Sequence, residues 1–128
     1  MANEAIEILV VDDEEMVREN LEAYLEDEGF VVHTAGSGEE GLEVLAGVNP
    51  KVGIIDMRLP GMSGNDFIIK AHDIKPDLKY LIHTGSTNYK LPLELMHIGV
   101  SRDEIFIKPL QNMDDLVVGI YRILGMKR

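Results

Sequence analysis

The sequence predicts an open, doubly wound α/β domain built around a parallel sheet of five strands. Apolar runs of strand length occur five times along the 128 residues, and segments with helical periodicity separate them. Runs such as IEILVV and KVGII are nearly continuously apolar, which is typical of parallel strands that helices cover on both faces. The expected strands are Ile6–Val11, Phe30–Thr34, Val52–Ile55, Lys79–His83 and Ile105–Ile107.

The first expected helix follows the first strand and is amphipathic. Acidic residues fill its outer side, and Gly29 stands where the helix should end. The expected buried stripe consists of Met16, Val17, Leu21, Tyr24 and Leu25.

Start and stop signals define the next two helices. Ser37 followed by Glu40 is a capping-box pattern that opens a second helix, which should stop before Pro50. A third helix is expected from about Gly64 to Ile74, with Phe67, Ile68 and Ala71 facing inward.

The last two expected helices flank the fifth strand. The fourth is short and begins near Leu91-Pro92, and the fifth covers roughly Met113 to Leu124. The buried stripe of the fifth helix should contain Leu116, Val117, Ile120 and Ile123.

Five strand–helix units of this size predict a flavodoxin-like (βα)5 arrangement with strand order 2-1-3-4-5. We expect one domain over residues 1–128, with its core at about 5–125. In such sheets, ligands bind outside the carboxyl ends of the strands, where the strand order reverses.

Composition excludes several classes of function. The net charge of −11 opposes direct nucleic-acid binding, and nine acidic residues but one basic residue lie between positions 12 and 28. Cysteine is absent, which excludes disulfides and thiolate chemistry. No stretch is long and apolar enough for a membrane span or leader, so we expect a cytoplasmic protein.

Polar side chains follow four of the five strands. Asp12 and Asp13 follow the first strand, Asp56 the third, Thr84 the fourth and Lys108 the fifth. An acidic pair after a strand is by itself a common helix cap, but Asp56 should emerge beside this pair. Three neighbouring carboxylates without His or Cys favour Mg²⁺, or Mn²⁺, and the lysine and threonine suit a phosphoryl group.

Four motifs in a fixed order cover nearly the whole chain. They are VVDDEE at 10–15, IIDMRLPGMSG at 54–64, HTGS at 83–86 and FIKPL at 106–110. Together they resemble the receiver domain of two-component response regulators. The resemblance implies a phosphoacceptor signalling domain, without enzymatic turnover of a substrate, that receives a phosphoryl group from a sensor histidine kinase or phosphotransfer protein.

The resemblance also implies individual roles. Asp56 would be the phosphoacceptor, and Lys108 would contact the phosphoryl group. Asp12, Asp13 and Asp56, with the Arg58 backbone carbonyl, would hold Mg²⁺. Thr84 would turn toward that group and shift the face formed by the fourth helix, fifth strand and fifth helix.

The acyl phosphate would hydrolyse slowly by itself. The family tunes this rate at the positions of Arg58 and Ser86, and prefers a small residue at the position of Gly85. The Lys108–Pro109 peptide bond is expected to be cis.

The sequence departs from the family around the fifth strand. An aromatic residue is usual three positions before the lysine, where this chain has Ile105, and Phe106 should lie on the opposite strand face. Phe106 is therefore expected to be a core or interface residue. Tyr89 could substitute for the missing ring, but we expect it to be an exposed loop residue. His83 directly precedes Thr84 at the sheet edge.

Other readings remain open. A phosphohydrolase of the haloacid-dehalogenase type also uses an aspartyl nucleophile, but it needs a second Asp where this chain has Arg58. A flavin carrier shares the predicted fold, but the DDEE turn would repel the cofactor's phosphate. The chain could be a stand-alone receiver with a downstream protein target, or part of a longer regulator with an output domain, and a monomer or weak homodimer.

Overall fold

The computed structural model describes residues 5–127. Residues 1–4 and 128, which the expected domain over 1–128 includes, lie outside the described range. The elements in chain order are β1 (Glu7–Val11), α1 (Glu15–Asp27), β2 (Val31–Ala35), α2 (Gly38–Leu45), β3 (Val52–Ile55), α3 (Gly64–Ile74), β4 (Lys79–Thr84), α4 (Leu93–Ile98), the 3₁₀ helix η1 (Arg102–Glu104), β5 (Ile105–Ile107) and α5 (Asp114–Ile123).

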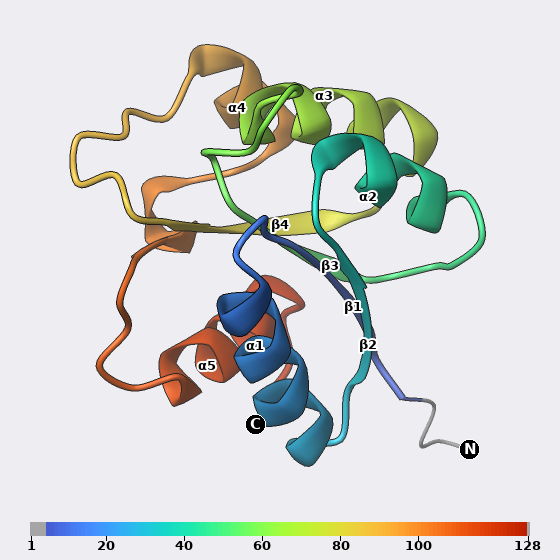
Figure 1. The fold of residues 1–128 in the computed structure, drawn as a ribbon, viewed down its shortest axis with the longest axis vertical. Helices are drawn as coiled ribbons and strands as arrows, with labels where there is room; N and C mark the ends of the chain where they lie inside the picture. Colours follow the sequence, from blue (N-terminus) through green and yellow to red (C-terminus); the bar gives the residue numbers. More distant parts are fainter. Residues whose placement is uncertain (1–4, 128) are drawn as a thin grey trace.

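The five strands form one parallel sheet in the order β2-β1-β3-β4-β5. Helices α2, α3 and α4 cover one face of the sheet, and α1 and α5 cover the other (Figure 1). The predicted doubly wound fold and strand order are therefore confirmed. Because β1 and β3 are neighbours at the centre, the turns that follow them meet at the same edge.

Side chains of each strand alternate between the two faces, as the period of a strand requires. Leu9 and Val11 of β1 join the apolar core beneath α2, α3 and α4, whereas Ile8 and Val10 join the core beneath α1 and α5. All four are fully buried. Apolar cores thus pack against the sheet on both of its faces.

The predicted buried stripe of α1 was wrong at one position. Met16 is 75% exposed, whereas Leu21 and Leu25 are buried. Met16 lies about 100° around the helix from Val17. The inward-facing line of residues spaced four apart, Val17, Leu21 and Leu25, therefore does not include Met16. The inward stripes of α3 and α5 are confirmed, since Phe67, Ile68, Leu116 and Ile120 are all fully buried.

Helix caps only partly follow the sequence signals. The Ser37 side chain accepts a hydrogen bond from the Glu40 backbone N–H, as predicted, but the Glu40 carboxylate accepts from Gly36 instead of from Ser37. A complete capping box occurs where none was predicted, between Ser101 and Glu104 around η1.

Gly64 at the start of α3 lets this helix pack closely against the segment after Asp56. We expect Gly64→Ala to destabilise the protein by about 1–3 kcal/mol, as for an overpacked core. A Cβ there would lie 2.8 Å from Met57 Cα and against the Asp56 carbonyl oxygen, and backbone cannot move aside cheaply. Urea unfolding would measure the change. Gly47→Ala is the matched control, since its Cβ would meet only one atom, at 3.9 Å; equal stability of the two variants would contradict the prediction.

Candidate functional site

The predicted convergence of side chains at the carboxyl edge occurs in the structure. Asp12 follows β1 directly, Asp56 follows β3, Thr84 ends β4 and Lys108 follows β5. Main-chain hydrogen bonds continue the sheet just beyond the strands, from Asp56 N–H to the Val11 carbonyl at 2.9 Å and from Lys108 N–H to the Thr84 carbonyl at 2.8 Å. The strand ends therefore hold these residues in fixed relative positions.

Four carboxylates gather at this edge. Asp12, Asp13, Glu14 and Asp56 each offer an oxygen, and these oxygens all lie within 4.8 Å of one another. Asp12 and Asp56 are buried, with 1% and 4% of their surface exposed, whereas Asp13 and Glu14 are exposed. An oxygen-only donor set that is half buried and half open to solvent fits a hard divalent cation that keeps some of its water.

The Lys108 ammonium lies among these carboxylates. Its Nζ is 2.8 Å from Asp12 Oδ2, 3.0 Å from Glu14 Oε1 and 3.2 Å from Asp56 Oδ2. Burial lowers the pKa of Lys108, but the hydrogen bonds with Asp12 and Glu14 and the charges of Asp12 and Asp56 outweigh burial and raise it. Lys108 is therefore a permanent cation. The Lys108–Pro109 bond is cis, as predicted.

The surroundings of Asp56 shift its pKa in opposing directions. Burial raises its pKa and the charge of Asp12 adds to this, whereas the backbone hydrogen bond from Arg58 and the charge of Lys108 lower it; the net pKa is raised. The Arg58 N–H donates to Asp56 Oδ1 at 3.1 Å, so Oδ1 and Oδ2 are held by different partners. The carboxylate is thus fixed in orientation and keeps its charge at some free-energy cost.

Because ionised Asp56 carries this free-energy cost, we expect Asp56→Asn to stabilise the folded protein in metal-free buffer, by an amount that depends on pH. Above its raised pKa, ionised Asp56 costs free energy in the folded state that it does not cost in the unfolded chain, where its pKa is near the ordinary 3.8. At pH 7 we therefore expect a higher Tm for Asp56→Asn than for the parent chain. The gain should shrink as the pH falls through the raised pKa toward 3.8, because Asp56 then binds a proton.

Thermal unfolding at several pH values between about 3.5 and 7, followed by circular dichroism, would provide this test. Asp66→Asn is the matched control, since Asp66 is an exposed acid of α3 outside the cluster. A Tm difference for Asp56→Asn that widens on acidification would contradict the sign.

The other predicted site residues are not members of the carboxylate cluster. Thr84 is fully buried, and its Oγ1 accepts a hydrogen bond from the Ser86 N–H at 3.2 Å. Gly85 is exposed, and a Cβ there would meet nothing within 4 Å. Arg58 reaches Asp56 through its backbone N–H. The hydrogen bonds of residues 5–127 do not join the Thr84 side chain to Asp56 or Lys108.

Two residues at the edge were missed by the sequence analysis. Glu14 pairs with Lys108, and the Arg18 guanidinium donates to the Asp12 carbonyl oxygen at 2.7 Å. Glu14 directly continues the acidic run, and Arg18 follows it by four residues on α1, so helical spacing was the available signal. Arg18 therefore supports the backbone of the turn that carries Asp12.

Ile105 and Phe106, where the chain departs from the family's aromatic pattern, lie on opposite faces of β5. Ile105 packs in the core beneath α2, α3 and α4, whereas Phe106 packs in the core on the other face, against Gly119. The prediction of Phe106 as a packing residue on the opposite face is confirmed. The prediction of Tyr89 as an exposed residue was wrong: it is half-buried and its hydroxyl donates to Asn65 Oδ1 at 2.7 Å. Burial raises the pKa of Tyr89 to about 12.

Fold and site together define a doubly wound α/β protein with an acidic, lysine-bridged crevice at its sheet edge. A family profile described as "Response regulator receiver domain" matches residues 8–120. The chain therefore belongs to the receiver domains of two-component response regulators. Phosphorylation of an aspartate and binding of Mg²⁺ are general in this family, whose members interact with histidine kinases.

Solved structures and curated relatives agree with this assignment. A CheY-like receiver domain protein from Methanospirillum hungatei is 29% identical, with a TM-score of 0.85 and 95% of each chain covered. The response regulator TrrA from Thermotoga maritima, solved in complex with Mg²⁺ and BeF, is 32% identical, with a TM-score of 0.80, covering 92% of this chain and 98% of that one.

The curated relatives are longer proteins. The response regulator GacA of Pseudomonas aeruginosa is 34% identical over 125 residues, which are 96% of this chain and 57% of that protein. The two-component response regulator PhoP of the same organism is 32% identical over 106 residues, which are 83% of this chain and 46% of PhoP. The chain thus spans about half the length of these relatives. Across residues 5–127, no helix has the length and apolar character needed to cross a bilayer.

Proposed function

We propose that this chain accepts a phosphoryl group on Asp56 and works as a phosphorylation-controlled protein switch. The donor would be a phosphohistidine of a sensor histidine kinase or phosphotransfer protein. A carboxylate oxygen of Asp56 forms the new P–O bond while the P–N bond to the donor histidine breaks, and the product is an acyl phosphate. The observation that carries the proposal is the approach of the Lys108 ammonium to Asp56 within an acidic cluster.

The site fits this chemistry in its charges. An anionic nucleophile and an anionic phosphoryl group repel each other. The two can react only when cationic groups offset that repulsion. Lys108 supplies one cation at 3.2 Å from Asp56 Oδ2. The carboxylates of Asp12, Asp13 and Asp56, with the Arg58 carbonyl, would hold Mg²⁺, or Mn²⁺, which would supply further positive charge to the phosphoryl oxygens.

The residues behind the cluster would convert the modification into a change of shape. We propose that Thr84 leaves its hydrogen bond with the Ser86 N–H and turns toward the phosphoryl oxygens, which carries the loop after β4 inward. Arg58, Ser86 and Gly85 would set the rate at which water removes the phosphoryl group. Ile105 and Phe106 lie on opposite faces of β5, so an aromatic partner for Thr84 would not come from this strand.

We propose that the residues from about 5 to 125 form a single receiver unit, and that its altered face binds a downstream protein or an output domain. The test is exposure of the purified protein to acetyl phosphate with and without Mg²⁺, followed by intact mass measurement. We expect the added mass of one phosphoryl group only with Mg²⁺, on the peptide that contains Asp56. Lack of uptake, or uptake in the presence of EDTA, would overturn the proposal.

A second assay, of phosphate release from small esters, tests the hydrolase alternative. A haloacid-dehalogenase-type enzyme would release phosphate continuously from small esters such as p-nitrophenyl phosphate, whereas a phosphoacceptor would take up one group and lose it slowly. Arg58 occupies the position where that enzyme class needs its second aspartate, and its side chain is exposed. We therefore expect negligible continuous turnover.

A further inference from the structure

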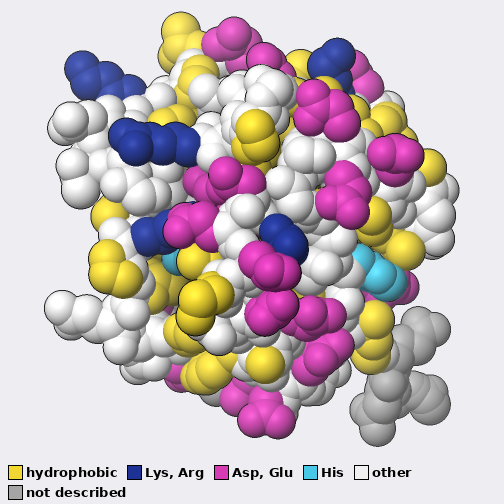
Figure 2. Space-filling model, viewed as in Figure 1, with side chains coloured by type: hydrophobic (Ala, Val, Ile, Leu, Met, Phe, Trp, Pro, Cys, Tyr) yellow, Lys and Arg dark blue, Asp and Glu magenta, His cyan; other side chains and the backbone are white. Residues whose placement is uncertain are grey.

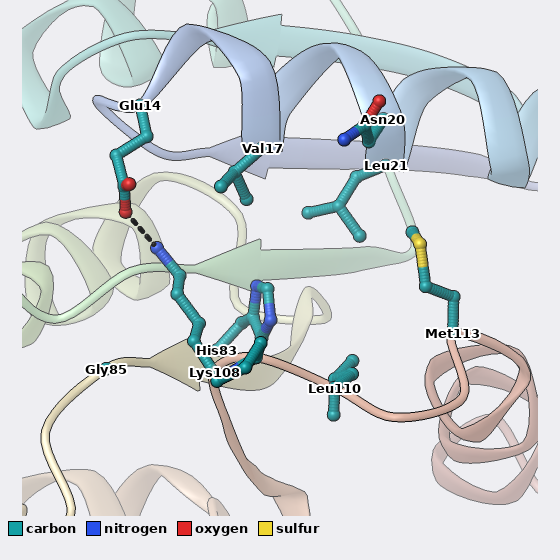
Figure 3. Close-up of a pocket in the computed structure, with 10 residues that line it drawn as sticks. Glu14, Val17, Asn20, Leu21, His83, Gly85, Lys108, Leu110 and Met113 are labelled. Carbon is teal, nitrogen blue, oxygen red and sulfur yellow. Dashed lines mark hydrogen bonds and ion pairs between the residues drawn. The ribbon is translucent and has the colours of Figure 1, made fainter.

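A cavity of about 400 Å³ lies next to the acidic crevice, between α1 and the segment that joins β5 to α5. Figure 3 shows Val17 and Leu21 extending from α1 toward His83, with Leu110 and Met113 closing the side that leads to α5. Glu14, Asn20 and Lys108 add polar groups to this lining. The volume falls within the range of small-molecule sites, which are mostly apolar with a few placed polar groups.

The cavity is distinct from the proposed phosphoacceptor site. Asp12, Asp13, Asp56 and Thr84 are not among its lining residues. His83 follows Leu81 on the strand face that α1 and α5 cover, whereas its neighbour Thr84 belongs to the opposite face. The two sites share Lys108 and Glu14 at their common boundary, where the two residues pair at 3.0 Å (Figure 3). Gly85, after β4, lines the cavity as well.

His83 is an unusual residue for the floor of such a cavity. Its side chain is buried, with 5% of the residue surface exposed, and its Nδ1 has no hydrogen-bond partner among the described residues. Buried polar groups are nearly always hydrogen-bonded, and an unpaired one carries a desolvation cost. Burial lowers the pKa of His83 to about 4, and the charge of Lys108 lowers it too, so the ring is neutral at neutral pH.

The electrostatic field at the cavity favours a positively charged occupant. The Lys108 charge is already matched by three carboxylates at 2.8, 3.0 and 3.2 Å, which leaves the boundary negative overall. The adjoining helix α1 adds exposed acids, and Figure 2 shows acidic side chains gathered over it. The whole chain carries a net charge of −11. An anionic ligand would meet repulsion from all three sources.

We propose that this cavity binds a small amphipathic organic cation, such as an aromatic amine. The apolar body would lie between Val17, Leu21 and Leu110, above the neutral imidazole of His83. The ammonium group would reach the Glu14 carboxylate at the boundary with the acidic crevice. Apolar side chains of α1 and of the segment before α5 line the space from two sides, so a molecule of this size is enough to fill it.

A matched series of three probes tests the proposal in metal-free buffer. Benzylamine, benzyl alcohol and benzoate have nearly the same shape and differ in charge. Two-dimensional ¹H–¹⁵N spectra of the whole chain would follow each titration. For benzylamine we expect saturable shifts at His83, Leu110 and Met113 with a Kd of about 1 mM, a usual strength for so few atoms. Benzyl alcohol should bind about fivefold more weakly, and benzoate should give no saturable shifts.

Variants locate the binding and its charge dependence. Glu14→Gln should weaken benzylamine about fivefold, whereas Glu19→Gln, which removes an exposed acid of the same helix outside the cavity lining, should leave the Kd within about twofold. Val17→Trp should fill the cavity and abolish binding, and an unchanged circular dichroism spectrum would show that this variant folds.

Three outcomes would overturn the proposal. They are equal affinity for benzylamine and benzyl alcohol, a Glu14→Gln variant that binds as tightly as the parent chain, and shifts confined to residues away from the cavity. None of these readouts depends on phosphorylation, so failure of this proposal and failure of the phosphoacceptor proposal are distinguishable.

Discussion

Asp56→Asn is expected to abolish phosphoryl uptake from acetyl phosphate, to below about one hundredth of the parent rate, because the variant lacks the nucleophilic carboxylate. Asparagine has nearly the same shape, and its side-chain oxygen can still accept the hydrogen bond that Arg58 N–H donates to Asp56 Oδ1 at 3.1 Å. The variant should therefore fold, and its Tm should equal or exceed that of the parent chain. Intact mass measured over time, with Mg²⁺ present, gives the rate.

The control for this prediction is Asp66→Asn. Asp66 is an exposed acid in the first turn of α3, at the far end of the loop that begins at Asp56, and it lies outside the carboxylate cluster. Asp66→Asn changes the net charge by the same amount as Asp56→Asn and leaves the carboxylate cluster intact. Phosphoryl uptake should therefore continue at the parent rate. Uptake by Asp56→Asn at that same rate would place the phosphoacceptor on another residue and refute the assignment of Asp56.

Elements bounded by strong local signals could be predicted to the residue. Strand β3 is an apolar run that begins shortly after Pro50 and ends just before Asp56, and α3 begins after the capping residue Ser63 and ends before Pro76. Local chemistry alone determines these limits. The inward position predicted for Met16 was wrong because this residue lies about 100° around the helix from Val17, outside the line that Val17, Leu21 and Leu25 form.

Long-range contacts were the part that the sequence could not supply. Tyr89 is held by Asn65, 24 positions away, and Lys108 is paired with Glu14, 94 positions away. Neither pair leaves a periodic pattern in the chain. The convergence of Asp12 and Asp56 was predictable, because strand order alone makes β1 and β3 neighbours. Topology therefore gives the site, whereas the partners of its charged groups require three-dimensional coordinates.

Lys108→Met is expected to slow phosphorylation of Asp56 by about 10²–10³-fold, the usual effect of removing one preorganised charge from a reacting anion. Methionine keeps the length and apolar stem of lysine and removes the ammonium that lies 2.8 Å from Asp12 and 3.2 Å from Asp56. The phosphoryl group would then approach the carboxylates with less positive charge to offset repulsion. Initial rates at saturating Mg²⁺ provide the measurement, and Lys90→Met, in an exposed loop, is the matched control.

The same substitution leaves Asp12 and Asp56 without their shared cation, so stability must be measured beside the rate. If repulsion between these carboxylates were the whole effect, Mg²⁺ would restore both the Tm and the rate of Lys108→Met to parent values. If Lys108 acts on the phosphoryl group itself, Mg²⁺ restores the Tm while the rate stays low. We expect the second result, because the ammonium lies at Asp56 Oδ2, the oxygen opposite the one that Arg58 holds. A parent-like rate in Lys108→Met would show that the metal alone suffices for the transfer.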